Sequence, residues 1–376
     1  MANGPRVLLA VEQLRRAVPG GIGAYARGLL GGIAQCAQEG DEVDITLLAS
    51  RAPGGVDPLT AFARPLVLSR LPGPLLTRGW DRGVLRAPAG FEVVHSVSSA
   101  MPPVRARAHV ASVVTVHDMA WRRHPETATP RGAKWHEMAL RRARDSGAAL
   151  VVTSKLVAAD LISDGVDADR ITIVHGGSDH LVPEDPVQSE ALLAQLGVRG
   201  EFLLTVSTLE PRKNVDRLLQ AYARARTTLP EPWPLVIVGP TGWGTVLSGP
   251  ADRAGVVFAG AVTDAALSGL YRRARAFVYV PLTEGYGLPP LEAMRSGAPA
   301  VIAHEVPSVV DLDEPGPPPA LIVDPLDVDA IAHALTIVMT DEEVRADLVA
   351  RGEAHARSRI WRTAAHQHIG LWRSLA

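Results

Sequence analysis

Short apolar runs, each bounded by turn residues, recur along the whole chain. Each run is only three to seven residues long and apolar at successive positions, which is typical of a strand buried on both faces of a sheet. The eleven expected strands are 7–10, 45–49, 110–116, 149–153, 171–174, 202–206, 235–238, 256–259, 276–280, 300–302 and 321–323. Between them, apolar residues recur at helical spacing, as after Asn214, which is expected to be the N-cap of its helix.

This alternation of buried strands and helices predicts parallel sheets joined by right-handed crossovers. The chain has 376 residues, more than twice the length of about 150 residues that is common for one domain. We therefore expect an α/β protein with two Rossmann-like, doubly wound domains that face a central cleft. Prolines interrupt the pattern near residue 184, so the expected domains are 1–184 and 185–358, followed by a mostly helical segment at 359–376.

Composition and charge exclude several classes of protein. The 38 basic and 40 acidic residues leave a formal charge of −2, which argues against a nucleic-acid-binding protein. Cys36 has no second cysteine to pair with, so a reducing cytosol is the expected compartment. The N-terminal apolar run is too short for a signal sequence, and no run approaches the roughly 18 residues of a membrane span. We expect a cytoplasmic protein and leave open its attachment to the inner face of the membrane.

A loop-rich region holds five arginines among leucine, proline and glycine, namely Arg64, Arg70, Arg78, Arg82 and Arg86. Solvated loops and a short helix are the favoured interpretation of this region. A surface for an acceptor or for a membrane is the alternative.

A glycine-rich segment follows the first expected strand and opens a helix. Gly21 and Gly23 let backbone amides approach an anion closely, and the helix N-terminus adds the positive end of its dipole. Together with Ala26, these glycines also fit the loose dinucleotide fingerprint, so an NAD(P)-dependent oxidoreductase stays open, with Arg51 as the partner of an NADP phosphate. A purely structural turn is the third interpretation.

Two further strand ends carry candidate functional side chains. His117 and Asp118 follow a buried strand, and residues at the carboxyl end of a parallel strand face the ligand crevice. A structural histidine is the alternative. Arg212 and Lys213 leave a later strand just before a helix, where adjacent cations suit a pair of phosphates. A solvated charged turn is the alternative there.

The most specific feature follows the strand 276–280. Glu284 is followed by a glycine-containing loop, and two prolines then open a helix at positions where missing N–H groups cost little. Glu292, inside that helix, comes within reach of the same ligand if the helix points its N-terminus at it. The backbone amides of the loop are expected to point into the crevice, and its residues are Gly285, Tyr286, Gly287 and Leu288.

At these residues the chain resembles the GT-B glycosyltransferases of family 4, whose signature is two glutamates separated by seven residues, here Glu284 and Glu292. The segments 20–23, 117–118, 210–214 and 238–240 also occur in the family's order, so the resemblance covers nearly all of the chain. It implies a retaining hexosyltransferase that uses a nucleotide-diphosphate sugar and needs neither a cofactor nor a metal ion. Mannose is the leading expectation for the sugar, ahead of UDP- or dTDP-activated hexoses.

The resemblance also implies roles for single residues. Glu284 would contact hydroxyls of the donor sugar and Glu292 the nucleotide ribose. Arg212 and Lys213 would neutralise the diphosphate, and His117 would lie next to the transferred sugar. Many members of the family carry Gly-Arg at the positions where this chain has Ser207 and Thr208. One usual cation is therefore missing, and Arg212 would have to replace it. The glycine loop would close on donor and acceptor, Gly239 would lie at the donor, and the segment 359–376 would pack back on the first domain.

Other functions stay open at this point. A nucleotide-sugar epimerase would want further acids or bases around the sugar, and a non-catalytic sugar-nucleotide sensor would not need both His117 and the cation pair. Three D-x-D triplets, at 167–169, 311–313 and 327–329, are a low-specificity match to the metal site of another glycosyltransferase architecture. The identity of the acceptor also stays open, and a hydroxyl of a saccharide, of a lipid-linked saccharide or of a small natural product is expected.

Overall fold

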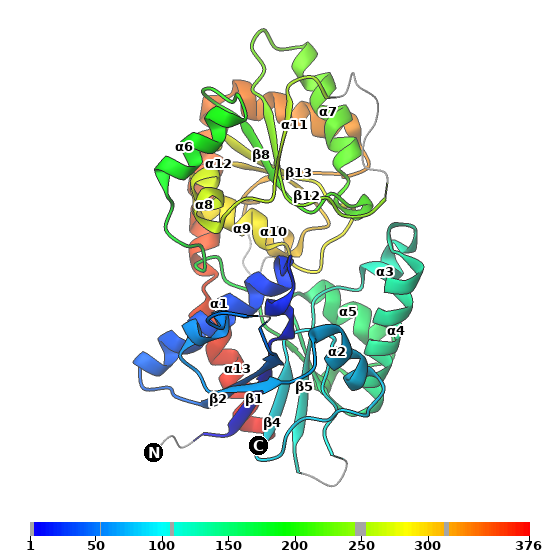
Figure 1. Ribbon diagram of the computed structural model, residues 1–376. Helices are drawn as coiled ribbons and strands as arrows, with labels where there is room; N and C mark the ends of the chain where they lie inside the picture. Colours follow the sequence, from blue (N-terminus) through cyan, green and yellow to red (C-terminus); the bar gives the residue numbers. More distant parts are fainter. Residues whose placement is uncertain (1–3, 53, 106–108, 245–252, 312–315) are drawn as a thin grey trace. The chain divides into compact units, whose positions relative to one another are not determined.

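The computed structural model describes residues 4–52, 54–105, 109–244, 253–311 and 316–376, and the chain forms two compact units (Figure 1). Unit 1 contains Met1–Met119, Thr129–His180 and Ile360–Ala376, and unit 2 contains Ala120–Ala128 and Leu181–Arg359. The sequence placed the break after residue 184, whereas the structure breaks between His180 and Leu181. Nothing in the sequence indicated that Ala120–Ala128 would group with unit 2.

The described part of unit 1 is built around seven parallel strands in the order β3-β2-β1-β4-β5-β6-β7. The strands are β1 (Arg6–Ala10), β2 (Asp44–Ser50), β3 (Leu66–Ser69), β4 (Val93–Ser96), β5 (Ala111–Val116), β6 (Ala149–Val152) and β7 (Ile171–Ile173). The α-helices are α1 (Gly20–Gln38), α2 (Gly73–Asp81), α4 (Pro130–Asp145), α5 (Lys155–Ser163) and α13 (Trp361–Leu375).

The described part of unit 2 has a second parallel sheet, with six strands in the order β10-β9-β8-β11-β12-β13. These are β8 (Leu203–Val206), β9 (Leu235–Val238), β10 (Val256–Gly260), β11 (Ala276–Tyr279), β12 (Ala300–Ala303) and β13 (Leu321–Val323). The helices are α3 (Ala120–Arg123), α6 (Pro186–Gln195), α7 (Val215–Thr227), α8 (Asp264–Arg273), α9 (Leu288–Arg295), α10 (Pro307–Val310), α11 (Val328–Thr340) and α12 (Glu342–Ser358). In Figure 1, α6 and α8 pack together on one side of this sheet, and α7 and α11 on the other.

The eleven expected strands are confirmed, but two further strands among the described residues were missed. β3 lies in the arginine-containing region that the sequence predicted as loops and a short helix, and α2 is that short helix. The residues of β3 are only partly buried, so their pattern is weak. β4 was missed because His95 and Ser96 interrupt its apolar run, although both side chains are buried.

The last helix of the chain packs along the first (Figure 1). Two glycines of α1 permit this close approach. A Cβ atom on Gly28 would lie 2.0 Å from the Trp361 indole, and one on Gly32 would lie 2.3 Å from the Trp361 carbonyl oxygen. The chain therefore returns to unit 1 after it has completed unit 2.

In both sheets the strand order reverses beside the first strand of the unit. β1 lies between β2 and β4, and β8 lies between β9 and β11. Open parallel sheets bind ligands at the carboxyl ends of the strands beside such a reversal. The loops after β1, β4, β8 and β11 are therefore the places to look for a site. Within the described residues, no helix has both the length and the apolar character needed to cross a bilayer.

Candidate functional site

The loops that follow β8 and β11 meet at the strand-order reversal of unit 2. The first loop carries Arg212 and Lys213 in a single 3-10 turn, and the second carries Glu284. The Leu282 amide donates to the Arg212 carbonyl oxygen (2.9 Å), and Arg212 Nη1 donates to the Thr283 carbonyl oxygen (3.1 Å). Backbone atoms thus join the two loops at the ends of neighbouring strands.

Glu284 is the centre of a largely buried ion cluster. Its Oε1 atom accepts hydrogen bonds from Arg212 Nη1 (3.0 Å), Tyr279 Oη (2.7 Å) and the Lys213 ammonium group. Lys213 also donates to Tyr279 Oη (2.8 Å), and Arg212 Nη2 donates to Glu210 Oε1 (2.9 Å). The structure therefore brings three of the predicted site residues into direct contact. It adds two partners that the sequence analysis did not propose, Tyr279 and Glu210.

The cluster fixes the ionisation of Glu284. Burial on its own would raise the pKa of this carboxyl, but the charges of Arg212 and Lys213 outweigh burial and lower the pKa to about 2. Burial lowers the pKa of Lys213, Arg212 lowers it further, and Glu284 opposes both effects. Within the part of the chain that the structure describes, Glu284 Oε2 accepts no hydrogen bond, so this atom is available to a hydroxyl group.

Asn214 is the N-cap residue of α7, as the sequence predicted, but its side chain has another role. Its φ of 57° is left-handed, and its side chain makes no capping hydrogen bond. Asn214 Nδ2 instead donates to the carbonyl oxygens of Val280 (2.9 Å) and Pro325 (2.7 Å). A capping side chain accepts a hydrogen bond within the first turn of its own helix, whereas these two partners lie 66 and 111 residues away. Asn214 ties the cation-bearing loop to the end of β11.

Glu292 lies inside α9 and is 6% exposed. Tyr271 Oη on α8 donates to Glu292 Oε2 (2.7 Å). The loop that leads into α9 is fixed as well, because the Ser308 hydroxyl donates to the Gly287 carbonyl oxygen (2.6 Å) and the Ser308 amide to that of Tyr286 (2.8 Å). Gly287 is the N-cap residue of α9 and has a φ of 97°, which only glycine adopts readily. The donor contacts predicted for the amides of this loop stay predictions.

Gly239 has a structural role at the end of β9. A Cβ atom there would lie 2.0 Å from the Ser207 carbonyl oxygen, and the φ of Gly239 is 143°. No other residue permits this approach of the two loops. Its proposed contact with the donor stays a prediction.

The glycine-rich segment of unit 1 forms the first turns of α1. The helix begins at Gly20, and both Gly21 and Gly23 lie inside it. A Cβ atom on Gly23 would lie 2.2 Å from the Pro19 Cβ atom, whereas nothing lies within 4 Å of one on Gly21. Gly23 is therefore required by the turn itself, and Gly21 leaves open space beside the helix N-terminus.

His117 follows β5 and is held at one ring nitrogen. Its Nε2 atom donates to the Val97 carbonyl oxygen (2.8 Å), since a carbonyl can only accept. Burial lowers the pKa of His117, so the ring is neutral at pH 7 and its Nδ1 atom carries a lone pair. The Tyr25 ring packs edge-on against it, with ring centroids 4.8 Å apart and an interplanar angle of 84°. His117 can therefore accept a hydrogen bond at Nδ1.

Two of the three D-x-D triplets serve as helix caps. Asp167 Oδ1 accepts from the Asp169 amide (3.1 Å), and Asp327 Oδ1 accepts from two amides of the first turn of α11 (both 2.9 Å). In the third triplet, Asp313 lies outside the described residues.

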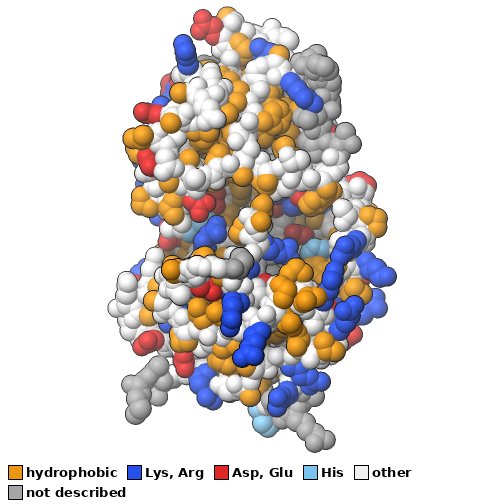
Figure 2. Space-filling view, viewed as in Figure 1, with side chains coloured by type: hydrophobic (Ala, Val, Ile, Leu, Met, Phe, Trp, Pro, Cys, Tyr) orange, Lys and Arg blue, Asp and Glu red, His pale blue; other side chains and the backbone are white. Residues whose placement is uncertain are grey.

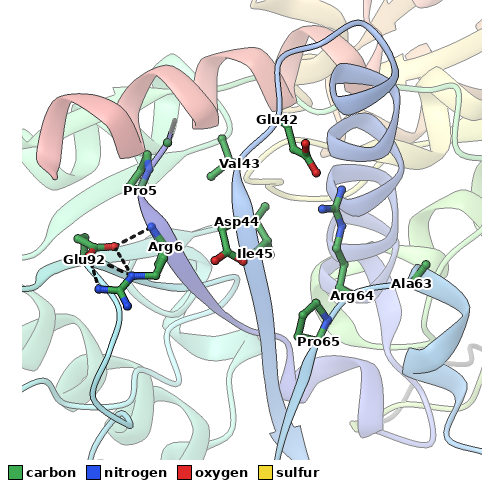
Figure 3. A pocket seen from close by; sticks show the side chains of 11 residues that line it. Pro5, Arg6, Glu42, Val43, Asp44, Ile45, Ala63, Arg64, Pro65 and Glu92 are labelled. Atoms are coloured by element: carbon green, nitrogen blue, oxygen red, sulfur yellow. Dashed lines mark hydrogen bonds and ion pairs between the residues drawn. The ribbon is translucent and has the colours of Figure 1, made fainter. Parts of the chain in front are cut away.

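A cavity of about 700 Å³ in unit 1 lies at the amino ends of the strands of its sheet (Figure 3). It is lined by Arg6 and Asp44, the first residues of β1 and β2, and by Glu92 and Arg64. Arg6 Nη2 donates to Glu92 Oε1 (2.6 Å). Because parallel sheets bind their ligands at the carboxyl ends of the strands, this cavity is not part of the candidate site.

Sequence comparison identifies the class of protein. Residues 19–180 match the family model Glycosyltransferase Family 4, and residues 194–355 match Glycosyl transferases group 1. The chain therefore belongs to the family 4 glycosyltransferases with the GT-B fold, and it is a glycosyltransferase. Among individual proteins, it is 33% identical over 273 residues to O-antigen chain mannosyltransferase B of Escherichia coli, and the match covers 70% of each chain.

Other relatives agree with this class. The chain is 30% identical over 324 residues to D-inositol 3-phosphate glycosyltransferase of Mycobacterium sp. (strain JLS), which covers 76% of this chain and 70% of that protein. The structure of sucrose-phosphate synthase from Thermosynechococcus elongatus has a TM-score of 0.71 at 18% identity and covers 99% of each chain. HepE from Anabaena, in complex with UDP and glucose, has a TM-score of 0.69 at 18% identity over 98% of this chain and 100% of that one. These two structures are similar in fold.

Family membership decides between the interpretations left open above. Because the chain is a glycosyltransferase, the oxidoreductase, epimerase and sensor alternatives are wrong. The partners that the sequence analysis missed had weak signals. Tyr279 is one of only five tyrosines and ends the strand before the glutamate motif, and Glu210 lies in the same short motif as Arg212. Tyr271, the partner of Glu292, had no signal because it lies on a different helix.

Proposed function

We propose that this glycosyltransferase moves a hexose from a nucleotide-diphosphate sugar to a hydroxyl of a saccharide, lipid-linked or small-molecule acceptor, with retention of configuration and without a metal ion. The observation that carries the proposal is the cluster of Glu284, Arg212 and Lys213 at the carboxyl ends of two neighbouring strands. A departing nucleoside diphosphate develops negative charge, and preorganised cations stabilise that charge. The relative named as a mannosyltransferase supports mannose as the sugar.

The contacts of the cluster suit the proposed roles. The hydrogen bonds of Lys213 to Tyr279 and Glu284 use two of its three ammonium protons, and the third is left for a phosphate oxygen. Glu284 uses Oε1 for its three donors and keeps Oε2 for hydroxyls of the donor sugar. Arg212 takes the place of the cation that many family members carry earlier in this loop.

The remaining residues complete the proposal. Glu292 is proposed to bind the nucleotide ribose with the carboxylate that Tyr271 orients. His117 is proposed to accept a hydroxyl hydrogen bond of the transferred sugar at Nδ1, because its Nε2 proton is committed to Val97. Retention follows the family resemblance, in which the anomeric carbon becomes oxocarbenium-like while the diphosphate leaves. Metal independence follows from the use of Arg212 and Lys213 in place of a divalent cation.

A panel of nucleotide sugars tests the donor. Slow hydrolysis of GDP-mannose, UDP-glucose and dTDP-glucose is measured without acceptor, with and without a chelator. We expect the fastest hydrolysis with GDP-mannose, unchanged by the chelator, and the α-anomeric sugar as the first product seen by NMR. Fastest hydrolysis of a UDP or dTDP sugar would replace mannose and leave the reaction class intact. Loss of activity with the chelator, restored by Mg²⁺ or Mn²⁺, would contradict the metal-independent mechanism.

We further propose that the enzyme works in the cytoplasm, on the inner face of an anionic membrane. Charge is distributed unevenly in the chain, since residues 64–145 contain 14 basic and 6 acidic residues and the remainder contains 24 basic and 34 acidic residues. A basic region next to exposed apolar side chains suits the headgroup layer of anionic lipids.

Two helices of unit 1 present this charge on exposed faces. They lie together, because Asp81 at the end of α2 accepts hydrogen bonds from Trp135 Nε1 (2.9 Å) and Arg142 Nη2 (2.6 Å) of α4. Exposed residues at helical spacing are Leu75, Arg78 and Arg82 along α2 and its C-cap, and Arg131, Lys134, Met138 and Arg141 along α4. Figure 2 displays cationic and apolar side chains next to each other over this part of unit 1.

Vesicle sedimentation tests the membrane proposal. We expect binding to vesicles with 30% phosphatidylglycerol and no binding to pure phosphatidylcholine. The double variant Arg78→Glu/Arg82→Glu should bind at least about tenfold more weakly, since each basic residue near an anionic surface contributes about 1 kcal/mol. The matched control is Arg272→Glu/Arg357→Glu, two exposed arginines of unit 2. Equal binding to both vesicle types, or an equal loss in the control, would contradict the proposal.

A further inference from the structure

A network of buried hydrogen bonds lies behind His117 in unit 1. It joins two strands, the first helix and the last helix of the chain. Its side chains are no more than 2% exposed, and they are Tyr25 on α1, His95 on β4, Thr115 on β5, and His368 and Trp372 on α13.

The first half of the network fixes the proton of His368. His368 Nδ1 donates to the Ala364 carbonyl oxygen (2.7 Å), since a carbonyl can only accept. Burial lowers the pKa of His368 to about 4, so the ring is neutral and its Nε2 atom has no proton. His368 Nε2 therefore accepts the hydrogen bond from Tyr25 Oη (2.9 Å).

The second half fixes the opposite tautomer of His95. Trp372 Nε1 can only donate, and it donates to His95 Nδ1 (3.2 Å). His95 is neutral because burial lowers its pKa, so its remaining proton is on Nε2 and is donated to Thr115 Oγ1 (2.9 Å). The two halves meet where the His95 and His368 rings stack, with ring centroids 5.5 Å apart and an interplanar angle of 18°. The direction of each hydrogen bond in the two halves is thus determined, and both halves are attached to α13, one through Trp372 and the other through His368.

Tyr25 and Thr115 connect this network to His117. The Tyr25 ring contacts the His117 ring edge-on, at 4.8 Å between ring centroids. Thr115 lies two residues before His117 in the chain. His95 lies two residues before Val97, and the Val97 carbonyl oxygen accepts the hydrogen bond from His117 Nε2. The network therefore contacts His117 directly, through the ring of Tyr25.

We propose that Tyr25 is a positioning residue for His117, and that the C-terminal helix fixes Tyr25 through its hydrogen bond to His368. The edge contact of Tyr25 restricts rotation of the His117 ring, so Nδ1 keeps one orientation. The hydrogen bond to His368, 343 residues away in the sequence, restricts Tyr25 in turn. The effect on transfer rests on the proposed role of His117, whereas the effect on its ring does not.

Kinetics of four variants test the proposal. Tyr25→Phe keeps the ring and loses the donor, and His368→Leu loses the acceptor. Both should lower kcat about fivefold to tenfold and change the donor KM less than twofold, because misplacement affects the reacting geometry and not nucleotide binding. His368→Gln keeps an acceptor oxygen and should recover most of kcat. The control is Tyr222→Phe in unit 2, whose buried hydroxyl donates to the Trp233 and Gly255 carbonyl oxygens (2.7 and 3.2 Å).

The ring of His117 is observed directly by ¹⁵N NMR of histidine-labelled protein, with His117→Ala used for assignment. In the wild type, the two ring nitrogens should have the separate shifts of a single Nε2-protonated tautomer. In Tyr25→Phe and His368→Leu these shifts should move towards each other, because the ring samples both tautomers, and in His368→Gln they should return.

The outcomes separate this proposal from the proposed function. Unchanged His117 shifts in Tyr25→Phe and His368→Leu would overturn the positioning role. So would a kcat loss of the same size in Tyr222→Phe, since that result means general destabilisation. If His117→Ala transfers sugar at the wild-type rate while the His117 shifts still respond to Tyr25→Phe, the positioning role stands and the catalytic role of His117 fails.

Discussion

The two units have parallel sheets of the same kind, but unit 2 holds a set of charged side chains and unit 1 a set of neutral ones. In unit 2, the loops at the strand-order reversal carry Arg212, Lys213, Glu210 and Glu284, which compensate one another as ion pairs. In unit 1, the side chains around His117 are neutral rings and hydroxyls connected by directed hydrogen bonds. Neither set leaves a buried charge without a partner, which would cost several kcal/mol.

The difference between the charged and the neutral set indicates what each unit can contribute to the reaction. A cluster of fixed charges stabilises charge that develops during a reaction, and its effect depends on which charged groups are present. A neutral network cannot do this, but it holds one tautomer and one ring orientation, and its effect depends on geometry. Substitutions and pH should therefore affect the two units differently.

Removal of a charge in unit 2 should have the largest effect. Lys213→Ala is expected to lower kcat by about 10² to 10³, as loss of one preorganised electrostatic group commonly does. Steady-state kinetics measures this change. Lys155→Ala, at an exposed lysine of unit 1, is the matched control and should have wild-type kinetics. A wild-type kcat in Lys213→Ala would show that the charged cluster is not where the reaction occurs.

Mild acid should destabilise unit 1 before unit 2. His368 has a pKa of about 4 when folded and about 6.5 when unfolded, so the stability that its neutral form provides is complete above pH 6.5 and is lost as the pH falls towards 4. The difference between the folded and unfolded pKa of His368 corresponds to a loss of about 3 kcal/mol in the free energy of unfolding. Glu284 has a pKa of about 2 when folded and about 4.3 when unfolded, so the stability that its ionised form provides is lost only below about pH 4.3.

Urea unfolding at pH 7 and pH 4.5 measures this difference. The wild type should lose stability between the two pH values, and His368→Gln, which has no titrating group there, should lose less. Equal losses in the two proteins would mean that His368 does not control the acid sensitivity of unit 1.

Loss of the neutral ring at the site should have a smaller effect than loss of the lysine. His117→Ala is expected to lower kcat about tenfold to a hundredfold, with little change in the Kd of the nucleotide measured by calorimetry, because His117 is proposed to contact the sugar. A nucleotide Kd weakened as much as kcat would place His117 at the nucleotide and remove the contrast between the two units.

The smallest effect should come from the second glutamate of the signature. Glu292→Ala is expected to raise the donor KM about tenfold and to leave kcat nearly unchanged, since a ribose contact is made equally in the ground and transition states. Saturation kinetics with the preferred donor measures both constants. A fall in kcat at an unchanged KM would instead assign Glu292 to the reacting centre.

The sequence by itself determined the class of fold and the candidate loops. Buried parallel strands are continuous apolar runs, so eleven of the strands in the described residues could be predicted locally. Strand ends are where parallel sheets bind ligands, which singled out His117, Arg212, Lys213 and Glu284. β3 was not predicted because its residues are only partly buried, and β4 was not predicted because polar residues interrupt its apolar run.

Only the tertiary structure decided which side chains are partners. Asn214 has the sequence context of an N-cap, but its partners come from two distant loops that the sheet brings beside it. Tyr25 and His368 are 343 residues apart, and their hydrogen bond exists because Gly28 and Gly32 let the last helix approach the first. A local pattern reports burial and turn geometry, because these act between near neighbours. Pairing of charges and protons depends on distances in space, which the order of residues along the chain does not contain.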